Sequence, residues 1–204
     1  MSDNHNDNVE AFNQLVNQII KEEMAAIKKQ PTTNGKGYLT IDFDASVVNT
    51  TDKPIISVRF TAEGMMNGMA HPFHHHRVLN FDLDSGETLS LEDLFQPDSD
   101  YLNRIAEYSR DVLNRKLRDK GMLMEGTTPT SENYKNWNLN PRGILITFDE
   151  YQVAPYVYGT QTVLIPYSVV KHDIAPDSPL ANCLKHQKRC LRNNLLTGGF
   201  IDQA

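Results

Sequence analysis

The chain has 204 residues, 39% of them hydrophobic and 23% charged, and a formal net charge of −6 at pH 7. This length and composition are typical of a folded domain with its own hydrophobic core. The negative net charge argues against a nucleic-acid-binding protein with a basic face, and no apolar run approaches the roughly 20 residues of a membrane-spanning helix.

The first part of the chain predicts a helix followed by a hairpin. Residues 9–29 repeat apolar side chains at helical spacing, from Phe12 to Ile27. Between residues 38 and 48 apolar and polar side chains alternate, as in a strand with one face buried and the other facing water. The same alternation returns over residues 56–63 after a short polar turn, so we expect the two segments to pair.

The rest of the chain adds a strand, a helix and two further strands. A third strand is expected over residues 74–83 and a long amphipathic helix over 101–118. Residues 144–149 and 162–165 form the last two strands. This order predicts an α+β domain: an antiparallel sheet with one long helix packed on a face, plus an N-terminal helix.

The same alternation predicts which side chains form the core. The helix contributes Ile105, Val112 and Leu113. The strand residues expected to pack beneath it are Leu39, Ile41, Phe43, Val58, Phe60, Leu79, Phe81, Ile144 and Ile146.

Residues 150–168 hold four tyrosines in a hairpin with a long turn. Rings this dense in a loop either fill the edge of a core or form a contact surface. We expect Tyr151 and Tyr167 to close the ends of the sheet, and Tyr156 and Tyr158 to be exposed between Pro155 and Gly159.

The exposed tyrosines are our candidates for ligand binding. Large, rigid rings with one hydroxyl group suit contacts with protein loops or sugar rings. We expect Gln161 and His71 to be their neighbours across the turn, which gives a predicted ligand-binding set of Tyr156, Tyr158, Gln161 and His71.

Histidines at positions 71, 74, 75 and 76 raise the possibility of a metal site. On a strand, His74 and His76 would share a face, and imidazole nitrogens bind zinc well. A zinc site needs further ligands and supporting hydrogen bonds, and no nearby cysteine or HExxH pattern supplies them. We therefore expect no metal and no cofactor.

Acidic residues offer an alternative, enzymatic interpretation. Glycoside hydrolysis needs two carboxyl groups on either side of the scissile bond, and Asp42, Asp44, Asp149 and Glu150 are available. All four are expected at outward strand positions or in a turn. No G-x-S-x-G pattern marks a serine nucleophile, so no catalytic residue is assigned.

Three blocks in the sequence resemble a known family. They are GMAHP at residues 68–72, NFDLDSGETLSLEDLF at 80–95, and YQVAPY followed by G-x-Q-x-V-x-I-PYS at 151–168. They are similar to the RsiV/PdaC-like extracytoplasmic domain family. That family includes sensor domains of lysozyme-responsive anti-sigma factors, the accessory domain of a peptidoglycan deacetylase and a mycobacterial secreted antigen.

The resemblance implies a periplasmic or secreted domain whose leader is absent from this chain, since residues 1–8 are polar and acidic. We expect three regions: an N-terminal helix and linker (1–37), the RsiV/PdaC-like domain (38–172) and a polar C-terminal tail (173–204). In an exported protein we expect the two cysteines, Cys183 and Cys190, to form a disulfide.

The resemblance does not imply an enzyme, because the catalysis of the deacetylase belongs to a different domain, which this chain lacks. The leading interpretation is a non-catalytic cell-envelope domain whose partner is an envelope protein or glycan. The alternatives are an envelope hydrolase acting on peptidoglycan or polysaccharide, and a tethering element that makes contact through the N-terminal helix.

Overall fold

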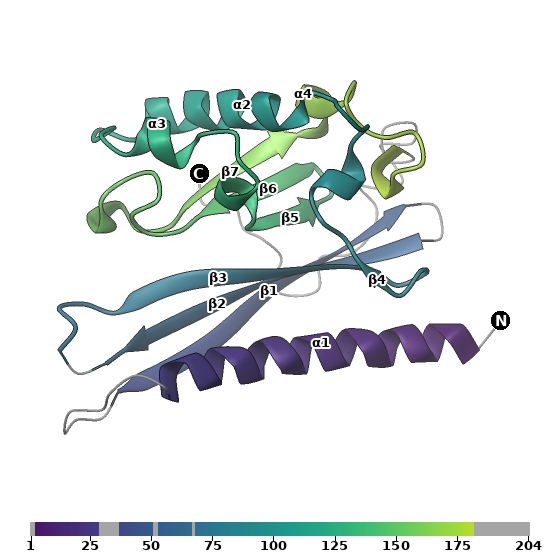
Figure 1. Ribbon diagram of the computed structural model, residues 1–204, viewed down its shortest axis with the longest axis horizontal. Helices are drawn as coiled ribbons and strands as arrows, with labels where there is room; N and C mark the ends of the chain where they lie inside the picture. The colour runs from purple at the N-terminus through teal and green to yellow at the C-terminus, as the bar shows by residue number, and fades with distance from the viewer. Residues whose placement is uncertain (1–2, 29–36, 51–52, 67, 182–204) are drawn as a thin grey trace.

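The structure is a computed structural model in which residues 3–28, 37–50, 53–66 and 68–181 are described (Figure 1). Its elements, in chain order, are α1 (Asp3–Lys28), β1 (Tyr38–Thr50), β2 (Lys53–Met65), β3 (Phe73–Asp82), β4 (Glu87–Thr88), η1 (Glu92–Leu94), α2 (Tyr101–Lys116), α3 (Leu123–Gly126), η2 (Glu132–Tyr134), β5 (Trp137–Asn140), β6 (Gly143–Phe148), η3 (Tyr156–Tyr158), β7 (Gln161–Pro166) and α4 (Tyr167–Val170).

The elements stack in four layers (Figure 1). An antiparallel sheet of order β1-β2-β3-β4 lies against α1, and a second antiparallel sheet of order β5-β6-β7 lies beneath α2. The predicted α+β class, the helix on a sheet face and the N-terminal helix are confirmed. The strands form two sheets rather than one, because β5 crosses over β1, β2 and β3 instead of joining their edge.

Each sheet has its own apolar core. Ile105 and Leu113 of α2 pack on Ile144 and Ile146 of the second sheet, as predicted. The first sheet packs on α1 instead. Its core residues are Val58, Phe60, Leu79 and Phe81, which contact a cluster containing Phe12, Val16 and Ile19.

The predicted core was therefore partly wrong. Val58, Phe60, Leu79 and Phe81 are buried, but beneath α1 rather than beneath the helix that carries Ile105. Leu39 and Ile41 are only half-buried. Phe43 is 69% exposed and lies on β1, an edge strand of its sheet.

A polar layer joins the two sheets. Ser57 Oγ donates a hydrogen bond to Asn80 Oδ1 (2.5 Å) and accepts hydrogen bonds from Asn138 Nδ2 (3.0 Å) and the Leu139 N–H (2.9 Å). Ser46 Oγ donates to the Leu139 carbonyl (2.5 Å). Ser46 and Ser57 belong to the strand faces that were predicted to face solvent. In the structure β5 covers this face of the first sheet instead.

No helix within the described ranges combines the length and apolarity needed to cross a membrane. Cys183 and Cys190 lie outside the described residues, so their pairing stays a prediction. The division into regions 1–37, 38–172 and 173–204 also stays a prediction. Ile174 and Leu180 are buried in the core beneath α2.

Candidate functional site

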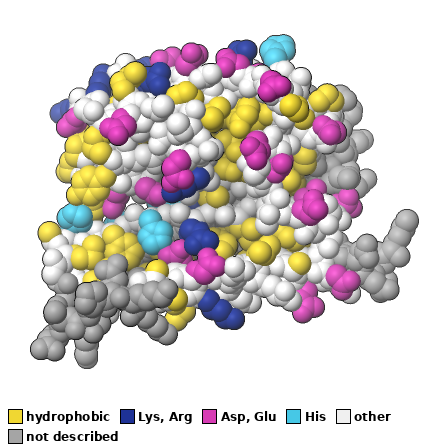
Figure 2. Space-filling model, viewed as in Figure 1, with side chains coloured by type: hydrophobic (Ala, Val, Ile, Leu, Met, Phe, Trp, Pro, Cys, Tyr) yellow, Lys and Arg dark blue, Asp and Glu magenta, His cyan; other side chains and the backbone are white. Residues whose placement is uncertain are grey.

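Two connections that are far apart in the sequence meet at one end of the sheets. The segment between β2 and β3 and the segment between β6 and β7 both lie at the left in Figure 1. Tyr156 Oη donates a hydrogen bond to the Pro72 carbonyl (2.9 Å), which joins the two. Figure 2 shows hydrophobic and histidine side chains together on this side of the molecule.

His71, Tyr151 and Tyr156 form an aromatic cluster at this meeting point. The rings of His71 and Tyr156 stack with centroids 3.7 Å apart, and those of Tyr151 and Tyr156 lie 5.8 Å apart. His71 Nδ1 lies 3.0 Å from the Pro72 carbonyl, which can only accept, so this nitrogen carries the proton. The other ring nitrogen then accepts from the Tyr151 hydroxyl at 3.3 Å.

The loop that carries Tyr151 and Tyr156 is anchored to the core of the domain. Val153 and Ala154 are buried in the core. Gln152 Nε2 donates to the Asn133 carbonyl (2.9 Å), and its Oε1 accepts from the Asp149 N–H (3.2 Å). The Gln152 backbone lies so close to Gly126 that a Cβ there would sit 1.9 Å from the Gln152 carbonyl oxygen. The exposed part of the loop therefore rests on a rigid base.

Tyr151 is the exposed tyrosine of this loop. It adopts a φ of 64° at the start of the loop, which is uncommon for a residue with a side chain. Its side chain is 52% exposed, and that of Val157 is 85% exposed. Tyr151 was predicted to close a sheet end, and Val157 was not predicted to be exposed. A positive φ at a residue other than glycine leaves no signal in the sequence that could have indicated this conformation.

Only part of the predicted ligand-binding set comes together. His71 and Tyr156 are in contact, but Tyr156 is half-buried rather than exposed. Tyr158 is half-buried on the core, and its hydroxyl accepts from the Asp119 N–H at 3.2 Å. Gln161 is buried, and its side-chain amide donates to the Tyr158 carbonyl at 2.6 Å. Tyr158 and Gln161 thus hold the base of the loop, and their binding role stays a prediction.

The three consecutive histidines connect layers of the fold. His74 Nδ1 lies 2.8 Å from Glu150 Oε1, and His76 Nδ1 lies 2.5 Å from Asp149 Oδ1, so both fasten β3 to the loop after β6. His75 Nε2 lies 2.6 Å from Glu23 Oε2 and fastens β3 to α1. Alternation along the strand sends the middle histidine to the opposite face of the sheet.

Each weak metal candidate thus has its own carboxylate partner. His74 contacts Glu150 and, at 3.5 Å, Glu63, whereas His76 contacts Asp149. Within the part of the chain that the structure describes, no group of three or more histidine, cysteine, aspartate or glutamate side chains is placed to hold a metal ion.

Two tyrosines of this end have a raised pKa. For Tyr156 the main cause is desolvation, with the carboxylate of Glu150 adding to it. For Tyr38 the main cause is the hydrogen bond that its hydroxyl donates to Glu63 Oε1 at 3.0 Å. Both phenols are therefore protonated donors at neutral pH. The arrangement offers stacked and tilted aromatic rings with hydroxyl and imidazole groups beside carboxylates.

Comparison with known proteins places this geometry in a family context. Residues 92–168 match the model of a family described as "Protein of unknown function (DUF3298)". A crystal structure of a member of that family from Bacteroides fragilis NCTC 9343 has the same fold, with a TM-score of 0.54. It is 20% identical in sequence, and the match covers 84% of this chain and 70% of that one.

Two curated proteins of Bacillus subtilis (strain 168) are also similar. The peptidoglycan-N-acetylmuramic acid deacetylase PdaC is 28% identical over 145 residues, which cover 70% of this chain and 30% of the deacetylase. The anti-sigma-V factor RsiV is 27% identical over 177 residues, which cover 81% of this chain and 60% of that factor. The chain thus spans less than two thirds of either relative. The family match and both relatives confirm the resemblance to the RsiV/PdaC-like family seen in the sequence.

Proposed function

We propose that this chain is a non-catalytic, periplasmic or secreted domain of the cell envelope that binds a protein or glycan ligand. The ligand contacts the recognition surface, which we define as His71, Tyr151, Tyr156 and Val157. The observation that carries the proposal is the exposure of Tyr151 and Val157 on a loop whose neighbouring residues, Val153 and Ala154, are buried. Side chains held on a rigid base lose little conformational entropy on binding.

The relatives support the envelope setting. One is named as a deacetylase of peptidoglycan and the other as an anti-sigma factor, so the shared region occurs in proteins of different activity. A region common to both is more simply explained by recognition than by one reaction. The match covers only 30% of the deacetylase, which leaves most of that enzyme outside the shared region.

The alternative is an envelope hydrolase. Its candidates are Asp149 and Glu150, which lie beside the recognition surface. Both carboxylates already contact a histidine, Asp149 at 2.5 Å and Glu150 at 2.8 Å. A general acid and base pair would instead face a common cleft, with the scissile bond of the substrate between the two carboxyl groups.

The proposal is tested by measuring binding and hydrolysis with the same protein. Purified chain is mixed with insoluble peptidoglycan and, separately, passed as bait through detergent-solubilised envelope proteins. We expect saturable binding in one of the two experiments, weakened by Tyr151→Ala and by Val157→Ser, without release of soluble muropeptides or reducing ends. Phe43→Ala is the matched control, since it removes an exposed ring from β1. Release of soluble fragments that Asp149→Asn abolishes would favour the hydrolase instead.

A further inference from the structure

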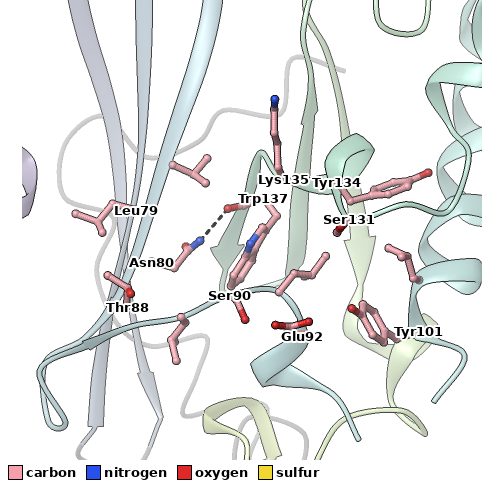
Figure 3. A pocket seen from close by; sticks show the side chains of 14 residues that line it. Leu79, Asn80, Thr88, Ser90, Glu92, Tyr101, Ser131, Tyr134, Lys135 and Trp137 are labelled. Carbon is pink, nitrogen blue, oxygen red and sulfur yellow. Dashed lines mark hydrogen bonds between the residues drawn. The ribbon is translucent and has the colours of Figure 1, made fainter. Parts of the chain in front are cut away.

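β1 lies at one edge of the first sheet. In the part of the chain that the structure describes, β2 is its only strand partner, and the two strands pair along their whole length without a bulge. The backbone and side chains along the outer side of β3 are already engaged. The His74 N–H donates to Glu150 (3.3 Å), and the Asn80 side chain donates to the Trp137 carbonyl (3.0 Å), as Figure 3 shows. β1 therefore provides the open edge of this sheet.

The hydrogen bonds between the strands determine which backbone groups of β1 face outward. The Leu83 N–H donates to the Pro54 carbonyl (3.0 Å), so the even-numbered residues of β2 bond to β3. The odd-numbered residues of β2 then bond to β1, where their partners have even numbers. The N–H and carbonyl groups of Leu39, Ile41 and Phe43 are thus directed away from β2. No hydrogen bond joins these groups to another residue of the described ranges.

The same three residues carry apolar side chains that are accessible from the edge. Phe43 is 69% exposed, and Leu39 and Ile41 are half-buried on the same face of the strand. Thr40 and Asp42, on the opposite face, are exposed. An exposed edge strand with open backbone groups and apolar side chains is a site at which another strand can pair.

Charge selects the register in which a second copy of the chain fits this edge. In an antiparallel pair with its two-fold axis at Asp42, the Asp42 carboxylates of both copies face each other. With the axis at Phe43, Asp42 faces Asp44, and like charges directly opposite are destabilising. With the axis at Ile41, Asp42 instead faces Thr40 of the second copy, whose hydroxyl can donate a hydrogen bond to the carboxylate.

The axis at Ile41 also matches the apolar side chains and the backbone groups. It places Ile41 opposite itself and Leu39 opposite the exposed ring of Phe43. Because the backbone groups of all three residues face outward, each of these pairs can exchange two N–H···O=C hydrogen bonds. Pairing ends before Ser46, where β5 covers the strand and Ser46 Oγ donates to the Leu139 carbonyl (2.5 Å).

We propose that two copies of this chain associate through residues 39–43 of β1, antiparallel and about a two-fold axis at Ile41, so that their first sheets become one continuous sheet. A two-fold interface uses the same patch of both subunits and must be self-complementary. The paired segment meets this condition in its backbone, its apolar side chains and its charges. It contains no residue of the recognition surface, so the proposal does not rest on the proposed function. Because the segment is short, the dimer is weak and dissociates on dilution.

Sedimentation equilibrium between about 1 and 500 µM protein measures the association. We expect monomer at the lowest concentration and dimer at the highest. Phe43→Glu should raise the dissociation constant of the dimer about tenfold or more, because a charge replaces an apolar group at the interface. Met124→Ser, which removes an exposed apolar side chain from α3, is the control and should leave this constant unchanged. Denaturant melts at about 1 µM then report on the monomer, in which Phe43 is exposed.

Disulfide trapping tests the register. Cys183 and Cys190 are replaced by serine, and Thr40→Cys and Asp42→Cys are made separately in that background. In the proposed register residue 40 faces residue 42 of the second copy at a non-hydrogen-bonded position, where Cα atoms lie about 4.5 Å apart, within reach of a disulfide. We expect the oxidised mixture of the two variants to cross-link much faster than either variant alone.

The proposal is overturned if the wild type stays monomeric up to about 500 µM. It is likewise overturned if Phe43→Glu, verified as folded by its melting curve, dimerises as tightly as the wild type. A mixture of the two cysteine variants that cross-links no faster than the single variants would exclude the register with its axis at Ile41.

Discussion

At the scale of single residues, the tyrosines of this chain serve different purposes that depend on burial. Tyr167 is buried and donates to the Asn140 carbonyl at 2.7 Å, and Tyr134 is buried and donates to the Thr127 carbonyl at 3.1 Å. Burial raises the pKa of both hydroxyls above the ordinary value of 10.0. Tyr151 instead lies open to solvent.

The raised pKa values predict a loss of stability in alkali. A tyrosine whose pKa is higher in the folded than in the unfolded state stabilises the fold fully below the unfolded value of 10.0, and this contribution is lost as the pH rises toward the folded value. Tyr167→Phe should lower the free energy of unfolding by about 1 kcal/mol at pH 8, because one hydrogen bond is lost. Above pH 10 the free energy of unfolding of this variant should decline less steeply than that of the wild type. Urea unfolding across this pH range measures both effects. A Tyr167→Phe variant that declines as steeply as the wild type would contradict the assignment.

The sequence predicted that His71 and Tyr156 would be neighbours, but not that Tyr151 would be the exposed tyrosine of the loop. The spacing of Pro155, Gly159 and the tyrosines predicted a rigid, aromatic turn, and His71 and Tyr156 do meet there. Which tyrosine faces solvent depends on the φ of Tyr151 and on hydrogen bonds to residues about 80 positions away, such as the one to Pro72. Neither follows from local residue patterns.

At the scale of elements, α1 is a structural part of the fold. It buries the apolar face of the first sheet through Phe12 and Ile19, and Phe12 contacts Phe81 with ring centroids 5.6 Å apart. Glu23 near its end contacts His75 and Arg77 of β3. The helix therefore has both an apolar and an ionic attachment to the sheet.

A pair of phenylalanines tests this arrangement. Phe43 and Phe60 are directly opposite each other in the β1–β2 pair, but Phe60 is buried beneath α1 and Phe43 is exposed. Phe60→Ala should cost about 3 to 5 kcal/mol of unfolding free energy, the usual range for a core phenylalanine. Phe43→Ala should change it by no more than about 0.5 kcal/mol. Equal costs in a denaturant melt would show that α1 does not cover the sheet as described.

At the scale of the whole molecule, polar contacts join two apolar halves. The residues between the sheets include Ser46, Ser57, Asn80 and Asn138, and all four are buried. The alternation over residues 38–48 and 56–63 predicted both strands. It does not distinguish a polar face that packs on a second sheet from a polar face that contacts water. The short strand β5 was missed for the same reason, because WNLN at residues 137–140 resembles a polar connection.

The polar layer can be tested at its centre. Ser57→Ala removes three hydrogen bonds and leaves the amides of Asn80 and Asn138 buried with fewer partners. An unsatisfied buried polar group costs about 1 to 3 kcal/mol, so we expect a loss of at least that size in a chemical melt. Ser168→Ala, an exposed control, should stay within about 0.5 kcal/mol of the wild type. A Ser57→Ala variant as stable as this control would mean that the layer does not hold the sheets together.

We propose that the recognition surface binds a ligand without holding the fold together, and a paired measurement on one variant separates these two roles. The melting temperature of Tyr151→Ala is compared with its dissociation constant for the peptidoglycan or envelope protein that the wild type binds. We predict a nearly unchanged melting temperature and binding weakened about tenfold, equivalent to about 1.4 kcal/mol. Unchanged binding, or a loss of binding that only follows a fall in the folded fraction, would contradict the claim.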